Sequence, residues 1–255
     1  MEDKNQKRPR LDRRLSAIAS MVNREGIPGV RLADIGADHG YLVTWLALEG
    51  KIAKGYACDV NEQPLERSKN TVELYGAQNL VELRLSDGLH TLTPDMVDWV
   101  VIAGMGGDLI ARILEEAAWE KESHIQYLLQ PNTKADHLRR WLLDHGYRTL
   151  SERAVEEGRF VYPILHVCPG RMEVSVQPLS LYLAVGLVGS ENRPLTGEER
   201  KYLERRRDAV QLQLHGIQRG KTEGQESQLV QLAEVISGID RLLEKKKADS
   251  AGKES

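Results

Sequence analysis

Two carboxylates close predicted strands at positions where they could hold a nucleoside. Asp59 ends an apolar run over residues 55–59, 23 residues after Gly36, and a carboxylate so placed can accept both hydroxyls of a ribose. Asp87 and Gly88 close the next run, over residues 81–85, where an acidic side chain and a backbone amide can contact an adenine edge. Either acid alone is also a common strand-end turn residue. Together with the glycine turn at Gly36, they favour an adenosine-binding crevice.

The turn after the first predicted strand lacks the glycines of a dinucleotide site. Residues 30–42 read as strand, tight turn and helix start, where an open α/β sheet exposes backbone N–H groups to a ligand. Asp38 stands where G-x-G-x-x-G would place its second glycine, so a pyrophosphate would meet a carboxylate. The turn therefore favours a cationic ligand. A histidine at a helix start, such as His39, more often caps or packs than catalyses.

Two later strand ends face the same crevice. Gly104-Met105-Gly106-Gly107 follows a predicted strand over residues 99–103, across the point where the strand order switches, and its glycines would let backbone approach a ligand closely. Gln130-Pro131-Asn132 follows a predicted strand over residues 125–129. The two amides either lie at the mouth of the crevice or are plain turn residues.

Strands and helices alternate along most of the chain. A helix is expected over residues 11–22, with Gly26 placed to end it. Five strands, over residues 30–35, 55–59, 81–85, 99–103 and 125–129, are each followed by a turn or helix signal. Strands over residues 147–154 and 159–167 are joined only by Glu156-Glu157-Gly158, so they should be antiparallel. The pattern predicts a mostly parallel sheet with helices on both faces.

The last third of the chain predicts a helical hairpin. Thr196-Gly197-Glu198-Glu199 is a capping box. Apolar stripes follow it at Leu203, Val210, Leu214 and Ile217, and then at Leu229, Leu232, Ile236, Ile239 and Leu243. Two such helices should pair antiparallel as a coiled coil. The expected organisation is a disordered basic tail (1–10), an α/β domain (11–177), a coiled-coil domain (178–247) and a disordered tail (248–255).

Composition limits the class of protein. A chain of 255 residues that is 41% hydrophobic can bury one sizeable core and carry an appendage. No apolar run is long enough for a membrane span, and residues 1–14 are too charged for a signal peptide, so a cytoplasmic protein is expected. Cys58 and Cys168 lack C-x-x-C spacing, so zinc, a redox motif and a disulfide framework are not expected.

The net charge of −3 hides a gradient. Residues 15–194 hold 17 Lys/Arg against 24 Asp/Glu, a net charge of −7, whereas both extensions are mildly basic. A polyanionic partner would need a local basic patch or a grip by the extensions. The alternative is that these charges form solvated helical faces. The candidate RNA-binding residues are Arg13, Arg14, Arg24, Arg205, Arg206 and Arg207.

Four strings carry a resemblance to a known family. DIGADHGYL, AGMGG, LQPN and RTLSERAVEEGRFVYPI resemble the bacterial TrmK family, which methylates N1 of the adenine at position 22 of tRNA with S-adenosylmethionine. The resemblance covers residues 11–170 closely and the helical extension in outline. It implies a Rossmann-like class I methyltransferase fold, a seven-stranded sheet whose last strand is antiparallel, and a C-terminal coiled coil. Gly40, Val43 and residues 160–162 depart from the family's lettering, which affects helix packing more than the crevice.

The resemblance also implies a cofactor and a substrate. The expected partner is tRNA, bound by a monomer or weak dimer without a metal. The residues expected to bind S-adenosylmethionine are Asp34, Gly36, Asp38, His39, Gly40, Asp59, Val60, Asp87, Gly88, Ala103, Gly104, Met105, Gly106 and Gly107. Asp38 is the first candidate to accept a hydrogen bond from the adenine N6 amine, and Gln130 and Asn132 are candidates for orienting the base.

Other functions remain open from sequence. The chain could be a class I methyltransferase acting on another RNA base or on a protein, or a cofactor-binding RNA adaptor without turnover. The helical hairpin could hold RNA or pair two subunits.

Overall fold

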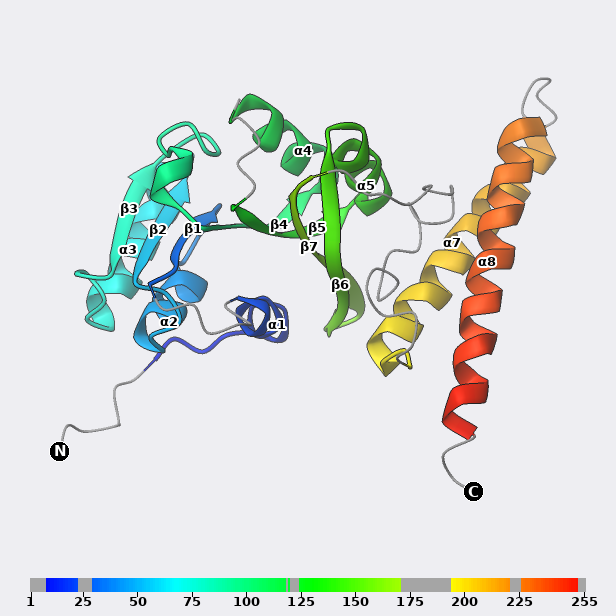
Figure 1. Ribbon diagram of the computed structural model, residues 1–255, viewed down its shortest axis with the longest axis horizontal. Helices are drawn as coiled ribbons and strands as arrows, with labels where there is room; N and C mark the ends of the chain where they lie inside the picture. The colour runs from blue at the N-terminus through cyan, green and yellow to red at the C-terminus, as the bar shows by residue number, and fades with distance from the viewer. Residues whose placement is uncertain are drawn as a thin grey trace.

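A seven-stranded sheet forms the centre of the computed structural model, which describes residues 8–22, 29–117, 119, 124–170, 194–220 and 226–251 (Figure 1). The strand order is β3-β2-β1-β4-β5-β7-β6, and β7 runs antiparallel to both of its neighbours, β5 and β6. This confirms the predicted class I methyltransferase topology. The strands are β1 (Arg31–Ile35), β2 (Lys54–Asp59), β3 (Val81–Leu85), β4 (Trp99–Gly106), β5 (Gln126–Thr133), β6 (Tyr147–Glu157) and β7 (Phe160–Pro169).

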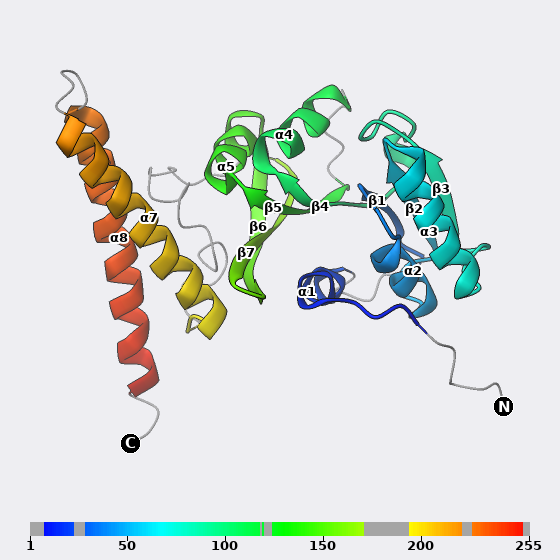
Figure 2. The same cartoon turned by 180° about the vertical axis from the view of Figure 1, so that it is seen from behind.

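Helices cover both faces of the sheet. α1 (Arg13–Met21), α2 (Tyr41–Leu48) and α3 (Glu62–Leu74) lie on one face, and α4 (Gly107–Glu116) and α5 (Ala135–Asp144) lie on the other (Figures 1 and 2). The strands alternate their side chains between the two layers. In β4, Val101 belongs to the apolar core on the side of α1, α2 and α3, whereas Val100 and Ile102 belong to the core on the side of α4 and α5. Two apolar cores therefore hold the crevice-forming strand ends in place.

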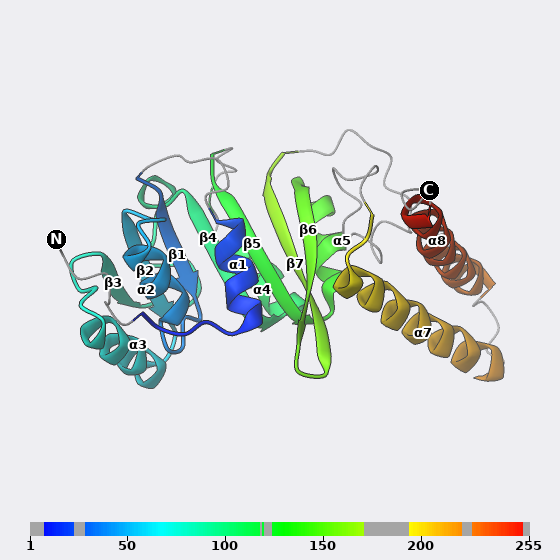
Figure 3. The ribbon, with the colours of Figure 1, turned by 90° about the horizontal axis from the view of Figure 1, so that it is seen from below.

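The helical extension is a hairpin at the far edge of the sheet. α7 (Gly197–Gly220) and α8 (Glu226–Ala251) pair with each other beyond β6 and β7 (Figure 3). The predicted capping box is confirmed, because the Thr196 N–H donates to Glu199 Oε2 at 2.9 Å and the Glu199 N–H donates to Thr196 Oγ1 at 3.2 Å. Ala154 of β6 joins the apolar core of the hairpin, so the extension packs on the sheet.

A buried polar cluster ties the hairpin to the α/β domain. Arg139 of α5 donates to Glu152 of β6 at 2.8 Å, and its guanidinium also lies 3.3 Å from the hydroxyl oxygen of Tyr202 in α7. Both charged side chains are almost fully buried. The cluster links three elements through one guanidinium.

Some element bounds differ from the sequence predictions. β4 continues to Gly106 and β5 to Thr133, so AGMGG and LQPN are not turns but a bulged ladder that pairs Ala103 with Gln130. Glycine permits this irregular pairing, although a segment so rich in glycine is typical of a turn. α1 ends at Met21, and Gly26 lies outside the described residues.

The expected tails and domain boundary are tested only in part. Arg8 pairs with Glu49 and Pro9 is buried, so the described end of the tail expected over residues 1–10 packs on the domain. α8 is helical to Ala251, past the start of the tail expected over 248–255. The expected domain boundary near residue 177 lies outside the described residues.

Removing one partner of the Arg139–Glu152 pair should destabilise the fold. Arg139→Ala leaves the Glu152 carboxylate buried without its guanidinium, which should lower the free energy of unfolding by about 3–5 kcal/mol. The double change Arg139→Met with Glu152→Leu should recover most of that loss. Urea denaturation measures both, with Arg112→Ala in the exposed Arg112–Glu116 pair as a control that should change little. Equal losses in the single and double variants would contradict this account.

Candidate functional site

The crevice predicted from the sequence would lie where the chain reverses its direction across the sheet. From β1 the chain moves outward to β2 and β3, and then returns to β4 on the other side of β1. The carboxyl ends of these parallel strands meet at one edge, and ligands of open α/β sheets bind at such a switch point. The turn after β1 is tied to β2, because the N–H groups of Gly36 and Ala37 both donate to the Cys58 carbonyl.

Two glycines bring the turn after β1 close to its neighbours. A Cβ on Gly36 would lie 2.3 Å from Cε of Met105 in β4, so the two sides of the crevice touch at this glycine. Gly40 has φ +64 and packs on Ser68 of α3, where a Cβ would lie 3.1 Å from the serine Cβ. Both positions favour glycine because their backbone is left-handed, and at Gly40 the close packing on Ser68 adds to this preference.

Asp34 supports the turn from below. It is buried at the end of β1, and its carboxyl accepts a hydrogen bond from the Val43 N–H in the first turn of α2. The N-cap of α2 is Gly40, which has no side chain to do this. Burial raises the pKa of Asp34 to about 7. Asp34 therefore acts as a cap for the first turn of α2. Its expected contact with the cofactor stays a prediction.

Asp59 is poised at the end of β2. Its Oδ1 accepts from the Asn61 N–H at 2.9 Å, while Oδ2 has no hydrogen-bond partner among the described residues. Val60 beside it and Leu85 at the end of β3 are exposed apolar side chains. Asp87 follows Leu85 and is exposed. A carboxylate with apolar surface on both sides is a suitable setting for a ribose and an adenine.

Asp38 has a partner that the sequence analysis missed. The exposed Asp38 carboxylate accepts two hydrogen bonds from Arg67 of α3, one of them from Nε at 3.1 Å. His39 lies with Nε2 3.7 Å from the same carboxylate and stacks on Tyr41 at 5.1 Å between ring centroids. Asp38 adopts φ +45, which is uncommon outside glycine. The carboxylate therefore stands at the crevice with its charge balanced by Arg67.

The ends of β4 and β5 share a network of amide hydrogen bonds. Gln130 is fully buried, and its Oε1 accepts from the Gly104 N–H at 3.0 Å. Its Nε2 donates to Asn132 Oδ1 at 3.1 Å, and Asn132 Nδ2 donates to the Gly104 carbonyl at 2.7 Å. Behind them, Gly107 begins α4 against the Lys134 carbonyl, where a Cβ would lie at 2.3 Å. Asn132 is exposed and Gln130 is buried, so Asn132 is the one of the two amides that faces outward.

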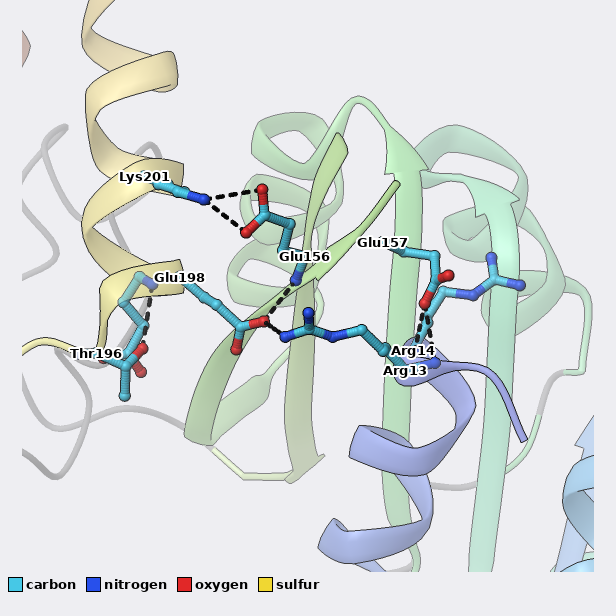
Figure 4. Close-up of polar contacts among 8 residues, drawn as sticks. Arg13, Arg14, Glu156, Glu157, Thr196, Glu198 and Lys201 are labelled. Carbon is cyan, nitrogen blue, oxygen red and sulfur yellow. Dashed lines mark hydrogen bonds and ion pairs between the residues drawn. The ribbon is translucent and has the colours of Figure 1, made fainter. Parts of the chain in front are cut away.

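The predicted RNA-binding arginines are largely engaged inside the protein. Arg13 pairs with Glu198 of α7 at 2.7 Å (Figure 4), and Arg14 reaches Gln130 at 3.1 Å. On α7, Arg205 donates to the Arg159 carbonyl, Arg206 lies 3.6 Å from Asp136, and Arg207 pairs with Asp208 and Asp240. Arg24 lies outside the described residues. RNA binding by these residues stays a prediction.

Two classes of site are not found in the described part of the chain. Its His, Cys, Asp and Glu residues form no group of three or more that could hold a metal ion. No described helix is long and apolar enough to cross a membrane. Cys58 and Cys168 are buried free thiols.

The chain is similar to known methyltransferases. The family described as "Methyltransferase domain" matches residues 11–165. The tRNA (adenine(22)-N(1))-methyltransferase of Bacillus subtilis is 33% identical over 172 residues, which are 68% of this chain and 71% of that protein. The crystal structure of the B. subtilis m1A22 tRNA methyltransferase TrmK matches with a TM-score of 0.77 and 27% identity, over 92% of this chain and 99% of that one.

A structure with a bound cofactor also matches. Sp1610 of Streptococcus pneumoniae, solved in complex with S-adenosyl-L-methionine, has a TM-score of 0.73 and 31% identity, over 92% of this chain and all of the other. The matches span both the sheet and most of the remaining chain, and they agree with the strand order and the paired helices described above. The chain belongs to the TrmK family of tRNA (adenine(22)-N(1))-methyltransferases.

Proposed function

We propose that this chain transfers the methyl group of S-adenosylmethionine to N1 of adenine 22 in tRNA. Membership of the TrmK family supports this reaction, since the B. subtilis relative is named a tRNA (adenine(22)-N(1))-methyltransferase. The arrangement at the switch point between β1 and β4 is the single structural observation that carries the proposal. It brings the Asp59 carboxylate, whose Oδ2 has no partner among the described residues, to the same edge of the sheet as two strand ends that bear glycine.

The residues present fit the cofactor. Asp59 Oδ2 would accept the ribose hydroxyls, while Val60 and Leu85 would cover the adenine ring. Gly36 and Gly104, both with a left-handed backbone, set the path of the two strand ends that would border the rest of the molecule. When bound, S-adenosylmethionine supplies an electrophilic methyl group on a sulfonium.

The base needs orientation more than acid–base chemistry. Adenine N1 has an in-plane lone pair, so no group of the protein has to remove a proton before transfer. The crevice must align N1 with the methyl group and exclude water. Asp38 would accept from the N6 amine, and the exposed Asn132 would orient the base edge, with Gln130 holding Asn132 from below.

Holding the tRNA is a separate task. A duplex must open or the nucleotide must flip to expose N1, so the protein has to grip the surrounding phosphates. The body is acidic, and the arginines of α7 are paired with carboxylates of the protein. Either the phosphates of tRNA compete with these carboxylates for the arginines, or the hairpin pairs two subunits and does not bind RNA. We propose a cytoplasmic monomer or weak dimer, because tRNA is the substrate.

Primer extension tests the reaction. After incubation of unmodified tRNA with the protein and cofactor, reverse transcription should stop at adenine 22, because a methyl on N1 blocks Watson–Crick pairing. A tRNA with guanine at position 22 is the matched control and should show no new stop. Methyl incorporation into tRNA without a stop would indicate another base, and incorporation only into protein would refute the tRNA proposal.

Asp59→Ala should weaken cofactor binding without unfolding the protein. Losing charge-assisted hydrogen bonds to the ribose should cost about 2 kcal/mol, or roughly 30-fold in the Kd of S-adenosylmethionine. Calorimetry measures the Kd. Asp87→Ala is a matched control at the next strand end, where a smaller loss is expected because the Asp87 side chain is exposed. An unchanged Kd in folded Asp59→Ala would remove Asp59 from the site.

Asp38→Ala should lower kcat rather than cofactor affinity. Loss of an acceptor aimed at the adenine should reduce kcat by about 100-fold, with a Kd for S-adenosylmethionine that changes little. Arg67→Ala is the matched control, because it removes the partner of Asp38 and leaves the carboxylate in place. If both variants lose the same activity, the pair acts as a structural unit. Wild-type turnover in Asp38→Ala at saturating tRNA would exclude the role.

A further inference from the structure

Arg14 lies far from the crevice in sequence but reaches into it. It comes from the first turn of α1, before the sheet begins, and its Nη1 donates to Gln130 Oε1 at 3.1 Å. The same nitrogen would lie 3.3 Å from a Cβ on Gly104, which itself has φ +81. The guanidinium thus packs against the backbone of β4 at the position where the amide network of β4 and β5 begins.

This contact completes the hydrogen bonding of Gln130. With Arg14, Gln130 Oε1 accepts from two donors, the guanidinium and the Gly104 N–H. Two donors on one oxygen allow only one orientation of the amide, since the flipped amide would place its NH₂ group against both of them. The fixed Nε2 in turn donates to Asn132 Oδ1. The Gly104 N–H and Asn132 already favour this orientation of the Gln130 amide, and Arg14 adds a charged donor that disfavours the flipped one. Arg14 thus helps to fix, through Gln130, how Asn132 presents its side chain.

α1 is held at its first turn, where Arg14 lies. The N–H groups of Arg13 and Arg14 both donate to Glu157 Oε2, at 2.9 and 3.3 Å (Figure 4). Arg13 also reaches Glu198 of α7, whose Oε1 accepts from the Glu156 N–H at 3.0 Å. A carboxylate at the positive end of a helix is favourable. The tip of the β6–β7 hairpin and α7 thus set the position from which Arg14 extends.

The charge of Arg14 is weakly compensated nearby. Among the described residues, the only carboxylate within 4 Å of the Arg14 guanidinium is that of Asp12, at 3.9 Å. Its Nε is buried and has no hydrogen-bond partner in the described part of the chain. Only a quarter of the side chain is exposed, so most of the guanidinium faces protein. A residue that served only to grip phosphate from the surface would not be placed in this way.

We propose that Arg14 is a positioning residue for methyl transfer, which acts through the buried Gln130 to orient the Asn132 amide toward the target adenine. The proposal rests on the proposed function. It assigns to Arg14 a role in kcat, in contrast to the RNA grip expected from its charge. The base edge would then be recognised by a side chain that α1 holds in one orientation.

Steady-state kinetics on tRNA separates the two roles. Arg14→Ala should lower kcat about 10- to 100-fold, with the KM for tRNA and the Kd for S-adenosylmethionine within about threefold of wild type. Arg14→Lys keeps the charge but not the planar fork, so it should recover only part of kcat. Arg10→Ala removes an exposed cation of the same segment and should leave kcat unchanged.

A double-mutant cycle tests whether Arg14 acts through Gln130. Arg14→Ala with Gln130→Ala should be no slower than Gln130→Ala alone, within about twofold, because the second change removes the group on which the first acts. Multiplicative losses would overturn the proposal. A raised KM with normal kcat and a shallower salt dependence of tRNA affinity would also overturn it, in favour of a phosphate grip.

A measurement without substrate distinguishes failure of this proposal from failure of the proposed function. The Gln130 side-chain NH₂ resonances, assigned by their loss in Gln130→Ala, should shift in Arg14→Ala and stay in place in Arg10→Ala. Unshifted resonances in Arg14→Ala would overturn the positioning role even if the wild-type protein methylates tRNA. Shifted resonances with no methylation by the wild-type protein would instead refute the assigned substrate.

Discussion

The start of α2 depends on a buried carboxyl, that of Asp34 in β1, which lies beside the Val43 N–H. Gly40 must be glycine because its backbone is left-handed and packs on Ser68, so α2 begins without a side-chain cap of its own. Asp34 supplies the missing acceptor from the adjacent strand. Burial makes this carboxyl harder to ionise and raises its pKa to about 7. Unfavourable local features of this kind are typical of turns at functional sites.

Ion pairs within the protein engage many of the arginines that an RNA-modifying enzyme of net charge −3 could use to bind phosphates. Many arginines of α1 and α7 stabilise the junction between the hairpin and the sheet, as with Arg13 and Glu198. Exposed pairs of this kind contribute little to stability and weaken with salt. The junction combines them with the buried Arg139 cluster, which salt screens much less. The hairpin is thus attached to the sheet in two ways: by the buried Arg139 cluster, and by exposed ion pairs whose arginines a polyanion could bind instead.

The sequence predicts local features well and tertiary partners poorly. Hydrophobic patterns place all seven strands, and the capping box at Thr196 forms as expected, because these signals depend on neighbouring residues. The extension of β4 through Gly106 is not predictable from composition, because glycine favours turns. It forms because β4 pairs with β5, which is distant in the sequence. The pairing of Arg67 with Asp38 joins residues 29 apart, and no local pattern signals it. Charge alone likewise suggests an RNA contact for Arg14, whereas the fold carries it to Gln130.

The contact between Gly104 and Arg14 restricts how related sequences can diverge. A side chain at position 104 would face both an unfavourable backbone angle and the guanidinium of Arg14. Losing Arg14 first would open the space but leave the backbone angle unchanged. Position 104 must therefore stay glycine whichever residue stands at position 14, because its backbone angle alone disfavours a side chain. Position 14 has no such backbone constraint, so a change there would act on the amide network and not on the path of the chain.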